Sequence, residues 1–170
     1  MNIIKEFLNS IEVNNSYRIR AEVYIIKNNN LIVGIPHKKN NWYIIPGGKV
    51  EDNESNEEAA KREALEEVGV KVKNLKYISN KKTLFKDPIY YIGSHDYSYV
   101  GMFDGYDKSL WGKHKDSYDI KELDIDEAIK IFKGYNIKQE DDVFFYERSA
   151  YIVGVLKKIK KCLNFKFFLF

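Results

Sequence analysis

The sequence predicts an α/β fold, and three observations support this prediction. The chain has 170 residues, a length suited to one hydrophobic core. Hydrophobic residues make up 44% and charged residues 31% of it, which excludes a disordered or fibrous protein. Segments that alternate like strands are interleaved with segments of helical periodicity, and no repeat or Pro-, Gly- or Ser-rich linker separates them. We therefore expect residues 1–170 to form a single domain.

The predicted strands begin with residues 17–26, which alternate between two faces. One face carries Ile19, Ala21, Val23 and Ile25, and the other carries Arg18, Arg20, Glu22 and Tyr24. An Asn-Asn-Asn turn at 28–30 should lead into a second strand. A third strand should stop where Pro-Gly-Gly bends the backbone. The second and third strands are expected at 31–35 and 42–45. Two further strands are expected at 70–78 and 97–103.

Capping residues mark the bounds of two predicted helices. Ser55, followed three residues later by Glu58, forms a capping box, and the helix should end at Gly69, a residue suited to a left-handed C-terminus. Asp124 should start a second capped helix that ends near Gly134. These bounds place a helix of about thirteen residues in the middle of the chain.

Both ends of the chain are also expected to be helical. Apolar residues at helical spacing predict a short amphipathic helix over 3–11. A last helix is expected over about 141–163, followed by a short basic and aromatic tail. The tail is expected to pack on the domain or against a second subunit rather than on a membrane.

The middle helix carries the most informative residues. Glu63, Glu66 and Glu67 are spaced i, i+3 and i+4, so they share one face. Because like charges repel, this cluster indicates a bound cation, although an acidic, solvated face is the alternative. Carboxylate oxygens suit Mg²⁺ or Mn²⁺, and the helix has no His or Cys, which argues against zinc.

A longer pattern surrounds these glutamates over residues 48–70. Its members are Gly48, Glu54, Arg62-Glu63, Ala64, Leu65, Glu66-Glu67, Val68, Gly69 and Val70. The pattern resembles the Nudix box of the Nudix hydrolases, and residues 42–51 resemble the lead-in to that box. Two positions depart from it: Ala64 replaces a bulky aliphatic residue, and Asn53 replaces a glycine in a turn that asparagine tolerates. Neither departure removes a carboxylate.

The resemblance implies an α/β/α sandwich around a mixed sheet. It also implies a Mg²⁺-dependent enzyme, with Mn²⁺ as a possible substitute, that hydrolyses a nucleoside diphosphate linked to another group. Glu66, Glu67 and the backbone carbonyl of Gly47 would then hold the metal. Glu63 would be a further ligand or the base that deprotonates water.

Three further residues of the box receive structural roles from the resemblance. Arg62 would orient the carboxylates through charge-assisted hydrogen bonds, together with Glu54. Gly48 would let the loop pass close to the helix, and Gly69 would end the helix.

Residues outside the box complete the expected site. An additional acid is expected from a flexible loop within residues 99–123. The candidates are Asp104, Asp107, Asp116, Asp119 and Glu122. Trp111, Asp116 and Asp119 are also candidate substrate contacts in this loop. Arg18 and Arg20 either face the cleft and bind phosphate or lie on a solvated strand face.

Two alternatives to a small-nucleotide hydrolase stay open. A decapping-like enzyme acting on RNA 5′ ends would need a basic track, and the lysine-rich end of the chain is its one hint. A binding module without turnover would not need the complete set of glutamates. The net charge of +3 does not by itself argue for nucleic acid.

The cellular context is bounded by what the sequence omits. The single Cys162 excludes an internal disulfide framework and is expected to be a plain helix residue in a cytoplasmic protein. No apolar run is long enough to predict a transmembrane segment. The resemblance makes a homodimer possible, and the sequence determines neither the leaving group nor the substrate.

Overall fold

The structure is a computed structural model that describes residues 14–36, 42–84, 91–111, 118–135 and 143–164. The helix expected over 3–11 and the end of the basic, aromatic tail lie outside these ranges. Within them, no helix is long and apolar enough to cross a membrane.

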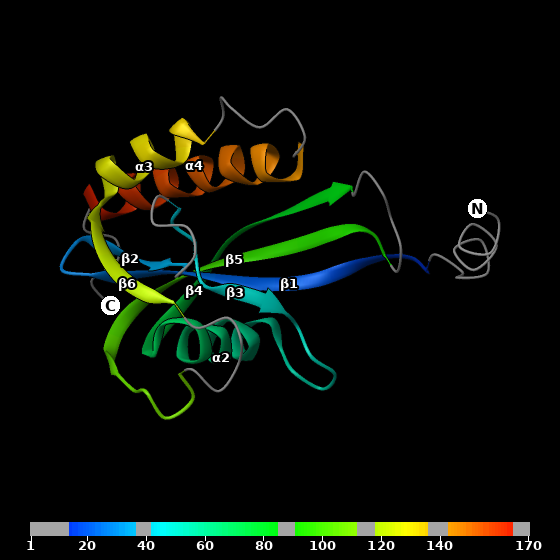
Figure 1. Ribbon diagram of the computed structural model, residues 1–170, viewed down its shortest axis with the longest axis horizontal. Helices are drawn as coiled ribbons and strands as arrows, with labels where there is room; N and C mark the ends of the chain where they lie inside the picture. The colour runs from blue at the N-terminus through cyan, green and yellow to red at the C-terminus, as the bar shows by residue number, and fades with distance from the viewer. Residues whose placement is uncertain (1–13, 37–41, 85–90, 112–117, 136–142, 165–170) are drawn as a thin grey trace.

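The described strands form one mixed sheet (Figure 1). They are β1 (Asn14–Lys27), β2 (Asn30–Ile35), β3 (Gly47–Lys49), β4 (Val70–Leu84), β5 (Tyr91–Tyr106) and β6 (Asp119–Asp124). The order across the sheet is β4-β5-β1-β2-β6, with β3 paired to β1. β1 and β5 run parallel, whereas the other pairs are antiparallel. The long strand β1 is therefore the centre of the sheet.

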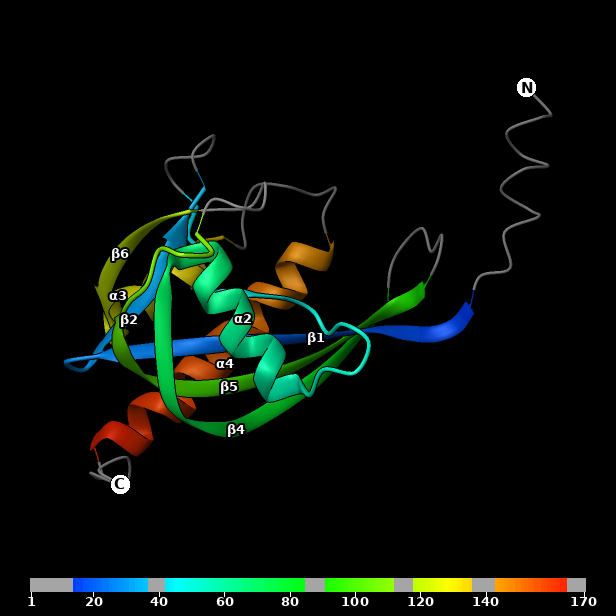
Figure 2. The same cartoon turned by 90° about the horizontal axis from the view of Figure 1, so that it is seen from below.

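Helices cover both faces of this sheet, as Figure 1 and Figure 2 show from two sides. α2 (Asn56–Val68) lies on one face, and α3 (Ile125–Gly134) and α4 (Val143–Asn164) lie together on the other. This arrangement is an α/β/α sandwich around a mixed sheet, so the predicted fold class is confirmed.

The core consists of two buried clusters, one on each face of the sheet. Beneath α2 the cluster contains Ala21, Val23, Ile25, Ile32, Ala59, Ala60, Ala64, Val68, Val70 and Tyr99. Beneath α3 and α4 it includes Tyr24, Ile26, Leu31, Val33, Phe132, Ile152, Leu156 and Ile159. The small alanines of α2 allow a close approach to the sheet, which explains why Ala64 is tolerated inside the box.

The second face of β1 is buried, which corrects the alternative that it is solvated. Tyr24 is fully buried and Glu22 is 2% exposed. The polar residues on this face suggested that it is solvated. The pattern was misleading because it does not show that apolar side chains of α4 pack against this face. A strand buried on both faces need not alternate strictly between polar and apolar residues.

The prediction of a strand over 42–45 is wrong, because the strand in this part of the chain is β3. Only Ile44 bridges to Gly34 there, whereas Gly47 and Gly48 pair with β1. The reason is steric. A Cβ on Gly47 would lie 2.6 Å from the backbone oxygen of Ala21, so glycine permits a pairing that other residues would block.

The predicted turns and caps are confirmed. Asn28, Asn29 and Asn53 adopt positive φ angles of 51°, 65° and 66°. Ser55 and its partner three residues later form the complete capping box at the start of α2. Gly69 ends that helix in the left-handed conformation, at φ 62°. The predicted helices after residues 124 and 141 are likewise present as α3 and α4.

The cap of α2 supplies a first prediction. Ser55→Ala removes the oxygen that accepts from the Glu58 backbone N–H at 3.2 Å, and it should lower the free energy of unfolding by about 1 kcal/mol. Ser55→Asp keeps an acceptor and serves as the matched control. Urea denaturation measures both variants, and equal stability of Ser55→Ala and wild type would contradict the prediction.

Candidate active site

Arg62 organises the acidic face of α2. Its Nε and Nη2 donate to the carboxylate of Glu54 at 2.8 and 3.0 Å, as the sequence led us to expect. Its Nη1 donates to Glu63 Oε1 at 2.9 Å and to Glu66 Oε2 at 3.0 Å. Nη2 also donates to the carbonyl of Lys49 at 2.9 Å. One guanidinium therefore fixes the carboxylates and ties them to the end of β3.

The backbone of β3 passes directly against these carboxylates. A Cβ on Gly48 would lie 2.0 Å from Glu63 Oε1, so glycine is required for this approach. The family resemblance implied such a close approach of the loop to the helix at Gly48. It brings the main chain of β3 within reach of the helix.

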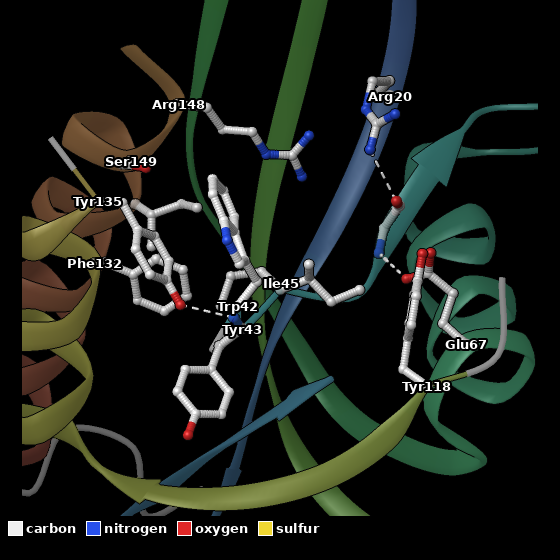
Figure 3. A pocket seen from close by; sticks show the side chains of 13 residues that line it. Arg20, Trp42, Tyr43, Ile45, Glu67, Tyr118, Phe132, Tyr135, Arg148 and Ser149 are labelled. Carbon is white, nitrogen blue, oxygen red and sulfur yellow. Dashed lines mark hydrogen bonds between the residues drawn. The ribbon is translucent and has the colours of Figure 1, made fainter. Parts of the chain in front are cut away.

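The peptide group of Gly47 connects α2 to the central strand. Its N–H donates to Glu67 Oε2 at 2.9 Å, and its carbonyl accepts from Arg20 Nη2 at 2.9 Å (Figure 3). Arg20 Nε also donates to Asp96 Oδ1 at 3.1 Å. Arg18 lies on the same strand but does not line the cleft described below. The structure thus brings Arg20, and not Arg18, to the acidic helix.

Two of the glutamates are buried carboxylates with altered proton affinity. Glu63 and Glu67 are each 9% exposed. Burial raises the pKa of Glu63, and it raises the pKa of Glu67 to about 8 although the Gly47 N–H opposes this shift. Because a nearby cation favours the charged form of an acid, these groups would ionise more readily with a positive partner beside them.

The donor set fits a divalent cation of the Mg²⁺ type. In the described part of the chain, no three His, Cys, Asp or Glu side chains are arranged to hold a metal as they stand. However, Glu63 and Glu66 already converge on a single cationic atom, Nη1 of Arg62. Carboxylate oxygens on one helix face, next to the Gly47 peptide, are the hard ligands that Mg²⁺ and Mn²⁺ prefer.

A cleft of about 190 Å³ opens beside Gly47 and Glu67 (Figure 3). Its opposite end is aromatic. Trp42 stacks on Tyr135, with ring centres 5.0 Å apart and planes 15° from parallel. Tyr135 also accepts a hydrogen bond from the backbone N–H of Tyr43 at 2.7 Å. One end of the cleft is therefore suited to a flat ring, and the other end is charged.

Sequence reasoning missed several residues of this cleft. Trp42 lies in the lead-in to the box, but the sequence does not show that it meets Tyr135 at the end of α3. Arg148 of α4 also lines the cleft. A signal for Arg148 was present, since it is a cation within the otherwise largely apolar first half of α4. No pattern in the sequence indicates which face of the sheet α4 covers.

Trp111 and Asp119 do not line this cleft, and their role as substrate contacts stays a prediction. They surround a second hollow, and Tyr118 borders both. Trp111 packs beside Gly69 and donates from Nε1 to the Tyr118 carbonyl at 3.3 Å. Its ring supports the end of α2 from outside rather than contacting the acidic face.

The described acids expected to complete the site lie elsewhere. Asp104 pairs with Lys73 at 2.6 Å, and Glu122 pairs with Lys27 at 2.5 Å. Asp107 accepts from the backbone N–H of Ser109 at 2.9 Å. These carboxylates have local partners, and none of them lines the cleft.

The segment 99–123 is also not one flexible loop. β5 occupies its beginning and β6 its end. Asp116 lies outside the described residues. Cys162 is a free, half-buried residue of α4, as predicted.

Fold and site together define an α/β protein in which a carboxylate-rich helix faces a cleft with an aromatic end. The family model of the NUDIX domain matches residues 17–140 of the chain. The protein therefore belongs to the Nudix family, and the family resemblance of the box is confirmed. The matched range ends before α4 begins.

Individual relatives agree with this assignment. YtkD of Bacillus subtilis (strain 168), a proposed 8-oxo-dGTP diphosphatase, is 53% identical over 47 residues, which are 28% of this chain and 30% of that protein. The match thus spans less than a third of that relative's length. The Bacillus subtilis pyrophosphohydrolase BsRppH, solved as a mutant, is 21% identical, with a TM-score of 0.61 over 91% of this chain and 87% of that chain. An ADP compounds hydrolase is 21% identical, with a TM-score of 0.58 over 84% and 72%.

The raised pKa of Glu67 predicts how stability depends on pH without metal. Between about pH 4.5 and 8 the folded state keeps a proton on Glu67 that the unfolded chain releases. Because the native state binds more protons in this window, this group lowers the free energy of unfolding as pH rises. Glu67→Gln should remove the effect and be more stable than wild type at pH 9 by roughly 2–4 kcal/mol.

Urea denaturation in EDTA at pH 5, 7 and 9 measures this difference. At pH 5 the two proteins should be nearly equally stable, since Glu67 is then protonated in the native state. A constant difference between the two proteins at all three pH values would refute the prediction.

Proposed function

We propose that this protein hydrolyses a pyrophosphate bond in a small nucleotide derivative, with a divalent metal held by α2. One observation carries the proposal. The N–H of Gly47 donates a hydrogen bond to the carboxylate of Glu67, and both residues line the charged end of the cleft. A substrate whose ring lies at the aromatic end would extend its phosphates toward the acidic helix. The names of the relatives point to the same class of bond.

The size of the cleft supports a substrate that extends beyond it. Enclosed sites for small organic ligands usually measure roughly 300–1,000 Å³. At about 190 Å³, this cleft can take one part of a nucleotide. Glu67 and Arg20 line the side of the cleft away from Tyr135 (Figure 3).

Each box residue has a role in this proposal. Glu66, Glu67 and the Gly47 carbonyl would hold Mg²⁺, or Mn²⁺ in its place, and Arg62 keeps the carboxylates oriented. The metal would supply charge neutralisation of the pyrophosphate and a position for the attacking water. The structure holds the acids that this role needs on one helix face.

Glu63 is the proposed general base. Burial raises the pKa of its carboxylate, which makes it a stronger proton acceptor than an exposed glutamate. The water oxygen then forms a bond to phosphorus, the bond from phosphorus to the bridging oxygen breaks, and the leaving phosphate takes the electron pair. Arg62, at 2.9 Å from Glu63 Oε1, fixes the direction of the base.

A substrate panel tests the proposal. Nucleoside triphosphates including 8-oxo-dGTP, ADP-linked compounds and a 5′-triphosphorylated RNA are incubated with Mg²⁺ or Mn²⁺, and release of phosphate, pyrophosphate or nucleoside monophosphate is measured. We expect turnover of a small nucleotide and its loss in EDTA. Turnover of RNA alone, with a steep loss of affinity as salt rises, would favour the RNA alternative. Binding without any turnover would favour the binding module.

Substitution of the proposed ligands should abolish turnover while the fold persists. Glu66→Gln and Glu67→Gln should each lower kcat by about 100-fold or more, because each removes a charged metal ligand. Glu57→Gln, on an exposed position of the same helix, is the control and should leave kcat unchanged. Full activity in both ligand variants would overturn the assignment.

A further inference from the structure

α4 contributes an arginine to the cleft from outside the matched family region. Arg148 lies in this helix, whereas the NUDIX match ends at residue 140. Its guanidinium points into the cleft from the side opposite β1 (Figure 3). The cleft is therefore completed by an element that the box does not predict.

A buried carboxylate anchors Arg148. Its Nη2 donates to Glu22 Oε2 at 3.2 Å, and the side chain of Glu22 is 3% exposed. Tyr24 and Ser98 donate to the other oxygen of Glu22, at 3.0 and 2.7 Å. Glu22 thus accepts three hydrogen bonds from its neighbours, and the one from Arg148 fixes the position of that guanidinium beside the cleft.

The remaining donors of Arg148 are open to the cleft. Among the described residues, the one fully buried side-chain nitrogen or oxygen atom that lacks a hydrogen bond is Nε of Arg18, so no nitrogen of Arg148 is both fully buried and without a hydrogen bond. The N–H groups of Arg148 that do not reach Glu22 are therefore accessible, in a side chain that is 21% exposed. Such oriented, partly desolvated guanidinium groups bind phosphate oxygens well.

Arg20 places a second guanidinium at the same cleft. Arg20 and Arg148 both line this cleft (Figure 3), and the side chain of Arg20 is 17% exposed. Asp96 and Glu22 offset part of their charge. An anion between the two arginines would relieve the repulsion that remains.

We propose that Arg148, together with Arg20, binds the phosphate that stays attached to the nucleoside when the pyrophosphate bond breaks. This inference rests on the proposed function and deepens it. The two arginines line the same cleft as the aromatic pair Trp42 and Tyr135 and as Glu67. The substrate class is accordingly a nucleoside 5′-phosphate derivative, and the nucleoside monophosphate product occupies the same subsite and competes with substrate.

Binding of products without metal tests the subsite directly. Calorimetry in EDTA measures AMP and GMP against adenosine and guanosine, with inorganic phosphate as a separate ligand. Wild type should bind a monophosphate at least about tenfold more tightly than its nucleoside, because charge-assisted hydrogen bonds to the phosphate are added. In Arg148→Gln the ratio of monophosphate affinity to nucleoside affinity should fall toward one, while nucleoside affinity is unchanged.

Matched variants separate binding from folding. Lys157→Gln removes a charge from an exposed position of α4 and should leave the ratio at its wild-type value. If Arg148→Gln alone does not fold because Glu22 loses its partner, the double variant Glu22→Gln with Arg148→Gln replaces it and should show the same lost ratio. Arg148→Lys should retain part of it.

Three results would overturn the proposal. They are equal loss of monophosphate and nucleoside affinity, an unchanged ratio in Arg148→Gln, and wild type that binds no monophosphate or only inorganic phosphate. These three binding results can be distinguished from a failure of the proposed hydrolase function. A wild-type protein that binds monophosphate through Arg148 but hydrolyses no substrate would disprove hydrolysis and leave the subsite standing.

Discussion

The site depends on the close contact between two glycines and the elements around them. Gly47 can pair with β1 only because it lacks a Cβ, and Gly48 can lie against Glu63 for the same reason. A side chain at either position would push β3 away from the sheet or from α2. The Gly47 peptide could then no longer join Glu67 to Arg20. Sterics at two residues thus hold the acidic helix at the edge of the cleft.

Charge is distributed around this contact in a consistent way. On one side, Arg62 gathers Glu54, Glu63 and Glu66 into a set of oriented oxygens. On the other side, arginines line the cleft, and buried acids position them. An acidic surface and a basic surface therefore meet at one opening, an arrangement suited to a metal-bound polyphosphate that needs both cation and anion binding.

Local chemistry explains why much of the fold was predictable. The Asn turn, the caps of α2 and α3 and the left-handed Gly69 depend on residues a few positions apart. The predictions that failed concern contacts distant in sequence. The stretch at 42–45 reads as a strand, but β1 pairs with β3 instead. The path of the chain likewise takes Trp111 and Asp119 to a second hollow, which the sequence does not indicate.

The sequence by itself determined the fold class, the acidic face of α2 and the glycines beside it, because spacing along one helix and one turn sets their geometry. Only the tertiary structure decided what faces the glutamates. The crossing of α4 over β1 brings Arg148 to Glu22, which is 126 residues away in sequence, and α3 carries Tyr135 to Trp42. How the helices pack on the sheet determines these contacts, and no local pattern in the sequence predicts them.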